Sequence, residues 1–181
     1  MEHILAKVGL FFGSTTGHTE EAAVLIRKEL DHYEEGLAQT FNVVRDSIHR
    51  MSEFSYLILG TSTWDDGELQ EDWRSLWFEL DKVNLAGKKI AIYGMGDQIT
   101  YPDSFQDALA RMADKLKARG AELVGTWPAE GYNYIHSTAV ENGKFVGLAL
   151  DNENQPQLTP KRIKSWVEQI VQEFQFHTHN N

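Results

Sequence analysis

The sequence predicts an α/β fold, a three-layer sandwich in which a five-stranded parallel sheet is covered by helices on both faces. Short apolar runs alternate five times with segments whose apolar residues recur at helical spacing. The runs are almost continuously apolar, which is typical of strands buried on both sides. The first, third and fourth runs each lead into a polar, glycine-containing loop. Such loops meet at the carboxyl edge of a parallel sheet, so we expect a binding site there.

The first half of the chain supplies three strands and one helix. The three apolar runs that form the strands cover residues 4–12, 41–44 and 56–60. The first helix begins at His18 or Thr19, because Glu20 and Glu21 suit the positive end of a helix dipole. Its apolar side consists of Ala22, Leu25, Ile26 and Leu30.

The second half supplies two more strands and three helices. We expect strands at residues 89–93 and from residue 122 onward, and helices over residues 71–83, 105–119 and from Thr159 to near the C-terminus. Gly120 is a typical helix stop. Thr159 and Pro160 suit the N-cap and the first position of the last helix.

Residues 126–148 interrupt this alternation. They contain glycine and tyrosine, and they separate the fifth strand from a further apolar piece at residues 145–150. We therefore expect an insertion that splits the last strand. We find no linker and no repeat, so the sequence predicts one domain over residues 1–176 and a disordered tail at 177–181.

Composition excludes several kinds of protein. The 181 residues include no cysteine, which excludes disulfides, thiol catalysis and iron–sulfur clusters. No apolar run approaches the roughly 20 residues of a membrane span, and the N-terminus lacks a signal-peptide pattern. We therefore expect a cytoplasmic protein without membrane insertion. The formal net charge of −10 argues against nucleic-acid binding and favours partners with basic surfaces.

The acidic residues are concentrated in two stretches. Residues 51–73 contain six carboxylates and residues 90–110 contain three, and neither stretch has a Lys or Arg. One interpretation is a solvated face. The other, if folding brings the two stretches together, is a docking rim or a set of charges that tunes the electrostatics of a bound group. The first stretch contains Glu53, Asp65, Asp66, Glu68, Glu71 and Asp72, and the second contains Asp97, Asp103 and Asp107.

The loop after the first strand has the composition of a phosphate site. It contains four hydroxyl side chains and two glycines before a helix, and backbone N–H groups at that position bind anions. Three residues separate Gly13 from Gly17, and His18 follows, so the loop is neither a Walker A motif nor a dinucleotide fingerprint. It suits a monophosphate held by neutral donors, although an ordinary capped turn remains the alternative.

The other two loops each carry an aromatic residue. Trp64 follows the third strand and Tyr101 the fourth, where each is better placed to cover a planar ring than to fill a core. Trp64 also breaks a near match to a nucleophile elbow. Two aromatics beside a phosphate loop together indicate a stacked aromatic cofactor with a phosphate tail.

On these residues the chain resembles the flavodoxin family. Residues 13–19 are similar to its phosphate loop, and 63–69 and 96–101 to its two flavin loops. Residues 143–151 and 162–166 resemble its C-terminal segments, and the insertion resembles that of the long-chain subclass. The resemblance implies a flavodoxin-like fold, non-covalently bound FMN and one-electron transfer at low potential between semiquinone and hydroquinone, without enzyme activity.

The resemblance also implies roles for individual residues. Trp64 and Tyr101 would sandwich the flavin ring, and the 65–66 peptide would turn its carbonyl toward the ring on reduction. Asp151 and Gln106 would make weaker contacts. The implied cofactor-binding residues are Ser14, Thr15, Thr16, Gly17, His18, Thr19, Thr63, Trp64, Asp65, Asp66, Gly67, Met95, Gly96, Asp97, Tyr101, Gln106 and Asp151, with none expected for a metal.

Two departures from the family pattern bear on function. His18 stands where Lys is common, and Asp65-Asp66 where Asn or Gly and an apolar residue are common. Carboxylates near the ring disfavour the reduced anion, so we expect a very negative lower potential. The implied partners are redox proteins with basic docking surfaces: an NADP(H)-dependent flavodoxin/ferredoxin reductase, and as possibilities photosystem, nitrogenase or radical-enzyme systems. A diffusing carrier is expected to be a monomer.

Three alternatives have different requirements. A response-regulator receiver needs acidic residues where Gly13-Ser14 and Gly60-Thr61 stand, which excludes it. A flavin-dependent NAD(P)H oxidoreductase needs basic residues for nucleotide phosphates, and the acidic rims argue against it. An FMN-binding regulator would bind flavin without a stable semiquinone or a reductase partner.

Overall fold

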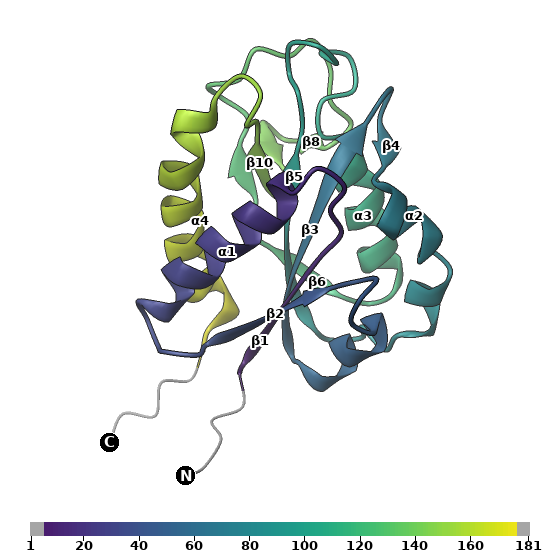
Figure 1. Cartoon of the computed structure of the whole chain (residues 1–181), viewed down its shortest axis with the longest axis vertical. Helices are drawn as coiled ribbons and strands as arrows, with labels where there is room; N and C mark the ends of the chain where they lie inside the picture. Colours follow the sequence, from purple (N-terminus) through teal and green to yellow (C-terminus); the bar gives the residue numbers. More distant parts are fainter. Residues whose placement is uncertain (1–5, 177–181) are drawn as a thin grey trace.

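The computed structural model describes residues 6–176 and contains a central parallel sheet (Figure 1). The strand order is β2, β1, β3, β5 and then β10, and each of these pairs is parallel. These strands span Ala38–Asn42, Val8–Phe12, Tyr56–Trp64, Lys89–Met95 and Leu148–Leu150, respectively. The predicted parallel α/β sandwich is confirmed.

Helices cover both faces of the sheet (Figure 1). On one face α1 (His18–Asp31) packs beside α4 (Thr159–Phe174). On the other face lie α2 (Glu71–Ser75) and α3 (Asp107–Ala118). Three short 3-10 helices connect these elements: η1 (Ile48–Glu53), η2 (Glu79–Lys82) and η3 (Pro156–Leu158).

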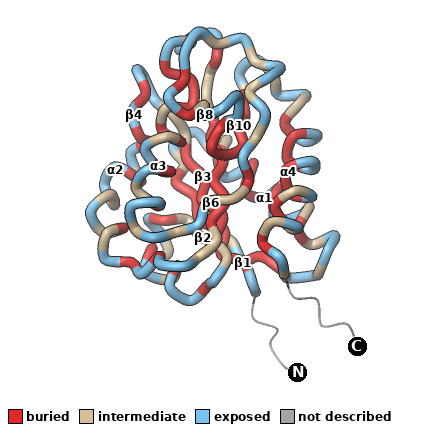
Figure 2. Tube along the Cα trace, turned by 180° about the vertical axis from the view of Figure 1, so that it is seen from behind, coloured by how far each residue is buried: buried red, intermediate tan, exposed pale blue. Residues whose placement is uncertain are grey.

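The sheet separates two hydrophobic cores, and the buried residues follow the strands and the inner sides of the helices (Figure 2). Under α2 and α3 the largest buried side chain is Trp73, whose Nε1 donates to the Gly60 carbonyl at 2.8 Å. Under α1 and α4 it is Trp166, whose Nε1 donates to the Gly125 carbonyl at 2.8 Å. Each indole thus buries a large apolar surface without leaving its N–H unpaired.

The last strand is split by the insertion, as predicted. β6 (Glu122–Val124) pairs with the first half of β5, and β10 pairs with its last three residues. Between them the insertion forms a small antiparallel sheet of β7 (Trp127–Pro128), β9 (Lys144–Phe145) and β8 (Val140–Glu141). The insertion therefore leaves the sheet and returns to it on the same neighbouring strand.

A partly buried tyrosine attaches the insertion to the sheet. The Tyr132 hydroxyl donates to the Ala149 carbonyl at 2.6 Å and accepts from Trp127 Nε1 at 2.9 Å. Its ring packs 5.6 Å from Phe105, and the Arg162 guanidinium lies 4.1 Å above it. Burial raises the pKa of Tyr132 to about 12, so the phenol stays neutral and keeps both hydrogen bonds.

The predicted helix over residues 71–83 is wrong. The chain is α-helical only over α2 and then tightens toward η2, where the bonds run Asp81 N–H to Phe78 O and Val83 N–H to Leu80 O. This tighter path brings Leu80 into the core and leaves Phe78 79% exposed. Aromatic residues are weak helix formers, so tertiary packing overrides the helical spacing here.

Three smaller boundaries also differ. β2 ends at Asn42 because the Asn42 side chain accepts from the Val44 and Arg45 N–H groups, which turns the chain away. β3 continues past Gly60 to Trp64, because its end pairs with β4 (Glu68–Leu69) in a hairpin. The N-cap of α4 is Leu158, not Thr159, whose hydroxyl bonds to Asn152.

The ends of the chain limit two predictions. The expected disordered tail at 177–181 lies outside the described residues, as does the start of the expected strand 4–12. Within residues 6–176 no helix is both long and apolar enough to cross a membrane.

Candidate functional site

A cavity of about 230 Å³ opens at the carboxyl edge of the sheet. The three predicted loops converge there, and the turn after β10 closes a fourth side. This is the edge where parallel α/β sheets bind ligands. Its lining consists of Thr16, His18, Thr19, Ser62, Thr63, Trp64, Asp65, Met95, Gly96, Asp97, Tyr101, Asn152 and Glu153.

The loop after β1 is held in shape by its own residues and by α2. Gly17 has φ 94°, a left-handed conformation, and its N–H donates to Ser14 Oγ at 3.0 Å. The Ser14 N–H donates to Asp72 Oδ2 at 3.1 Å, and Gln70 Nε2 donates to Thr15 Oγ1 at 3.0 Å. Sequence reasoning missed Gln70 and Asp72, because it ended the phosphate site at the loop itself.

This loop presents several unused donors. The backbone N–H groups of Thr15, Thr16, His18 and Thr19 donate to no other atom of the described chain. They lie at the N-terminus of α1, where the helix dipole is positive. The arrangement therefore suits a compact anion such as a phosphate group.

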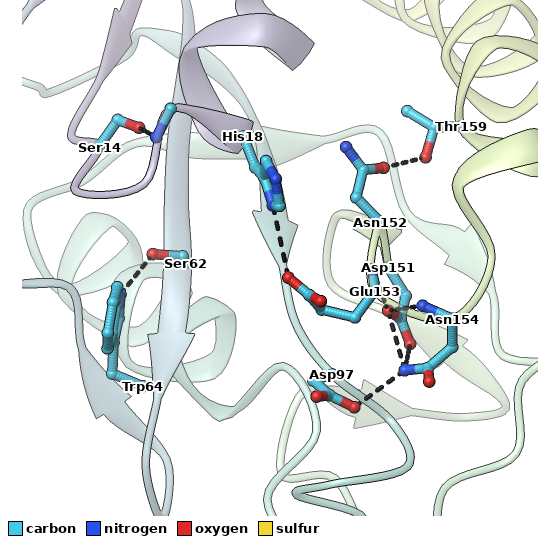
Figure 3. A network of polar contacts seen from close by, with 11 residues as sticks. Ser14, His18, Ser62, Trp64, Asp97, Asp151, Asn152, Glu153, Asn154 and Thr159 are labelled. Atoms are coloured by element: carbon cyan, nitrogen blue, oxygen red, sulfur yellow. Dashed lines mark hydrogen bonds and ion pairs between the residues drawn. The ribbon is translucent and has the colours of Figure 1, made fainter.

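Two aromatic side chains line the cavity. Trp64 lies at the end of β3, where its Nε1 donates to Ser62 Oγ at 2.8 Å (Figure 3). Tyr101 lies on the loop after β5, and its N–H bonds to the Asp97 carbonyl at 3.1 Å. Both side chains remain partly exposed, at 36% and 39%. Exposed aromatic faces on two walls of one cavity suit a flat aromatic ligand.

The tight turn between β3 and β4 is strained. Asp65 has φ 44°, a left-handed conformation that is uncommon for a residue with a side chain, and Gly67 has φ 96°. The Gly67 N–H closes the turn on the Trp64 carbonyl at 3.1 Å. The Ser104 hydroxyl donates to the Asp65 carbonyl at 3.4 Å. Asp65 lines the cavity, whereas Asp66 and Gly67 do not.

Asp97 connects the loop after β5 to the turn after β10. Its Oδ1 accepts from the Thr100 N–H at 2.8 Å and from Asn154 Nδ2 at 2.8 Å (Figure 3). Burial acts against the charged form of Asp97, but the hydrogen bonds from Thr100 and Asn154 outweigh it and lower the pKa of the carboxyl. Asp97 therefore stays negatively charged at neutral pH.

Asp151 is a fully buried organiser of the same region. Its Oδ2 accepts from Gln98 N at 3.0 Å and Gln98 Nε2 at 2.8 Å. Its Oδ1 accepts from the N–H groups of Glu153 at 3.1 Å and Asn154 at 3.0 Å. Asp151 is not among the lining residues, and it shapes the cavity through these neighbours, so its contact with a cofactor stays a prediction.

Ten of the seventeen predicted residues line the cavity, and seven do not. Gln106 is the clearest exception, because it is fully buried and its Nε2 donates to the carbonyls of Gly94 and Leu150. It joins β5 to β10 behind the cavity. The others that do not line it are Ser14, Thr15, Gly17, Asp66, Gly67 and Asp151.

The sequence analysis also missed the turn after β10. Asn152 and Glu153 line the cavity, and Asn154 bonds to Asp97. The rule that ligands bind at the carboxyl ends of strands pointed here too, but the insertion hid which segment forms the end of the fifth strand.

The charges around the cavity are mostly negative. Asp65, Asp97 and Glu153 line it, and so does one basic side chain, His18, with no Lys or Arg among the lining residues. The two acidic stretches therefore do meet in space. Within residues 6–176 no three His, Asp or Glu side chains gather as metal ligands would.

Comparison with known proteins identifies the family. The model of the family described as flavodoxin matches residues 10–166, which is most of the chain. The chain belongs to the flavodoxin family. Flavodoxins are electron-transfer flavoproteins and not enzymes.

Individual flavodoxins match over nearly the whole chain. A flavodoxin of Synechococcus elongatus is 44% identical over 94% of this chain and 99% of its own length. Flavodoxin 2 of Escherichia coli is 46% identical over 94% and 98%. The crystal structure of Fusobacterium nucleatum flavodoxin bound to flavin mononucleotide superposes with a TM-score of 0.86, at 35% identity, covering 92% of this chain and 98% of that one.

Proposed function

We propose that this chain is an electron carrier that works through one non-covalently bound FMN. The observation that carries the proposal is the cavity itself, in which unused N–H donors at the start of α1 lie beside two exposed aromatic side chains. A flavin with a phosphate tail combines the two ligand chemistries that these features suit.

The residues present fit FMN well. The unused N–H groups at positions 15, 16, 18 and 19 would bind the phosphate. Trp64 and Tyr101 would lie against the flavin ring. Met95, Gly96 and Asp97 would line the edge of the ring. FMN supplies the electron chemistry, while this chain's residues bind it, orient it and exclude water from its ring.

The charges support a low potential. Asp65 and Asp97 line the cavity, and no Lys or Arg does. Each electron added to the ring increases its tendency to carry negative charge, which nearby carboxylates oppose. We therefore infer that the bound flavin takes its second electron only from donors of low potential. We also infer that it can pass this electron on to acceptors of low potential.

The same charges favour partners with basic docking surfaces. We infer that an NADP(H)-dependent reductase is one such partner and that the chain acts as a cytoplasmic monomer. Electrostatic steering accelerates association at low salt. The rate of reduction by a basic reductase should fall steeply as salt rises, and a rate independent of salt would exclude this mode of docking.

Stepwise anaerobic photoreduction of the purified protein, followed by visible absorption, tests the proposal. We expect a yellow protein that turns blue and then pale, which means two separate one-electron steps. A protein that stays colourless after incubation with FMN would refute flavin binding. A direct change from yellow to pale would retain FMN but refute the one-electron role.

A further inference from the structure

We propose that His18 determines how strongly this cavity prefers a phosphorylated flavin to an unphosphorylated one, and that this preference falls as pH rises. The inference rests on the proposed function, since it assigns His18 to the phosphate of the bound FMN. It goes further by giving the site a selectivity residue and a pH dependence.

His18 lies where it can act on the phosphate. It is the first residue of α1 and lines the cavity next to the unused N–H groups of Thr16 and Thr19. Its side chain points across the cavity toward Glu153 in the turn after β10, with 3.8 Å between Nδ1 and Oε1 (Figure 3). The imidazole is 37% exposed, so it can reorient without disturbing the core.

Within residues 6–176, His18 is the only residue lining the cavity that can carry a positive charge. All the other ionisable groups among its lining residues are the three carboxylates and the Tyr101 phenol. A phosphate monoester carries about −1.5 to −2 charges at neutral pH. Neutral N–H donors and the helix dipole compensate only part of that charge, so an imidazolium at His18 would be the one full positive charge beside it.

The other charged groups among the lining residues of the cavity are all carboxylates. Glu153 Oε1 lies 3.8 Å from His18 Nδ1, and Asp65 and Asp97 line the same cavity. On α1 itself Glu20 is not among the lining residues of the cavity, and it pairs with Arg45 at 3.5 Å.

From the sheet below, Tyr93 donates its hydroxyl to the Thr19 carbonyl at 2.8 Å. Burial raises the pKa of Tyr93 well above its usual value, so this phenol remains neutral at physiological pH. The charge near His18 therefore changes with the histidine and with the phosphate, and not with the tyrosine.

The direction of the pH effect follows from linkage. Histidine side chains gain and lose their charge between about pH 5 and 8. A bound phosphate stabilises the imidazolium, so its contribution to affinity is complete at the acidic end of this range. It is lost at the alkaline end of the range, where the imidazole is neutral. Glu153 pairs with the imidazolium when no phosphate is bound, which positions the ring at the cavity.

The experiment measures dissociation constants of FMN and riboflavin for the apoprotein from pH 5.5 to 8.5, by fluorescence quenching. Wild type is compared with His18→Gln, His18→Lys and a matched control, His49→Gln. His49 is another exposed histidine, and its Nε2 lies 3.5 Å from Glu79 Oε2. Neither residue lines the cavity. Dividing the constant of each variant by that of wild type at each pH removes the titration of the phosphate itself.

We expect His18→Gln to weaken FMN binding about tenfold at pH 5.5 and to match wild type at pH 8.5, as for loss of one charge-assisted hydrogen bond. Riboflavin binding should not change. His18→Lys should keep tight FMN binding at pH 8.5, and His49→Gln should behave as wild type throughout.

Three results would overturn the inference. One is a His18→Gln effect on FMN that does not vary with pH, and another is an equal loss of riboflavin affinity, which would mean a structural role. The third is failure of the wild type to bind FMN at all, which would also refute the proposed function and so is distinguishable from the first two.

Discussion

Replacing Asp151 by Asn tests how the cavity is held together. The carboxylate is fully buried and accepts two N–H groups of Gln98 on one oxygen and the N–H groups of Glu153 and Asn154 on the other. An Asn side chain has one accepting oxygen in place of two. Its NH2 group would therefore face N–H donors at the position of the other carboxylate oxygen. Since Gln98 Oε1 is already bonded to the Asn133 N–H, the Gln98 side chain cannot simply reverse.

The magnitude follows from the bonds that are lost. Whichever way the amide points, at least one buried or partly buried N–H loses its acceptor, which costs about 1–3 kcal/mol, and the remaining bonds lose their charge assistance. Together these effects should lower the free energy of unfolding by about 3 kcal/mol, or the melting temperature by about 9 °C for a domain of this size. FMN affinity should fall as well, because the loops carrying Asp97 and Glu153 lose their shared anchor.

Urea unfolding of the apoprotein at pH 7 measures the change, followed by circular dichroism and tryptophan fluorescence. Asp31→Asn is the matched control, because Asp31 accepts from Gly36 N at 3.1 Å in an exposed turn. It should cost less than about 1 kcal/mol. If Asp151→Asn is no more destabilising than this control, the organising role of Asp151 is wrong.

Three further predictions concern the ring, its charge and the insertion. Asp65→Asn should raise the lower one-electron midpoint potential of bound FMN by about 50 mV, because a carboxylate at roughly 6 Å opposes added charge and solvent screens about half of that effect. Spectroelectrochemistry measures the shift. The control Asp66→Asn should give a smaller shift, because Asp66 does not line the cavity, and equal shifts would contradict this. Trp64→Ala should weaken FMN binding by about 2 kcal/mol through lost stacking, measured by fluorescence titration, and unchanged affinity would remove Trp64 from the site. The pKa of Tyr132 is raised to about 12, so the free energy of unfolding should fall as pH rises from 10 to 12. Tyr132→Phe should make this fall smaller, leaving the part due to Tyr93, when urea midpoints are compared at pH 8 and 11. An equal fall in the variant and the wild type would disprove the contribution of Tyr132.

Local patterns predicted the sheet and the three main loops well. Nearly continuous apolar runs have one simple explanation, a doubly covered parallel strand, so β1, β3 and β5 were found within a few residues. The carboxyl-edge rule also indicated the loops that carry Trp64, Asp97 and Tyr101, and these three residues line one cavity.

The errors share a physical cause, which is that long-range contacts outweigh local preference. Residues 71–83 have helical spacing, but packing of Leu80 under the sheet selects a tighter path after Ser75. The family resemblance implied a weak cofactor contact for Gln106, which stays a prediction, and local sequence did not show that its buried amide joins β5 to β10. Neither outcome is visible without knowing which strands are neighbours.

The split fifth strand has a consequence for behaviour at high concentration. Outer strands of a sheet expose unpaired N–H and C=O groups that can recruit another molecule's strand, and long, flat ones promote aggregation. In this protein one edge of the sheet is divided between two strands of three residues each, β6 and β10. The chain leaves the sheet between them to form the insertion. The opposite border, β2, has five residues and ends at the Asn42 turn. Short, interrupted borders of this kind offer little template for strand pairing between two copies of the chain.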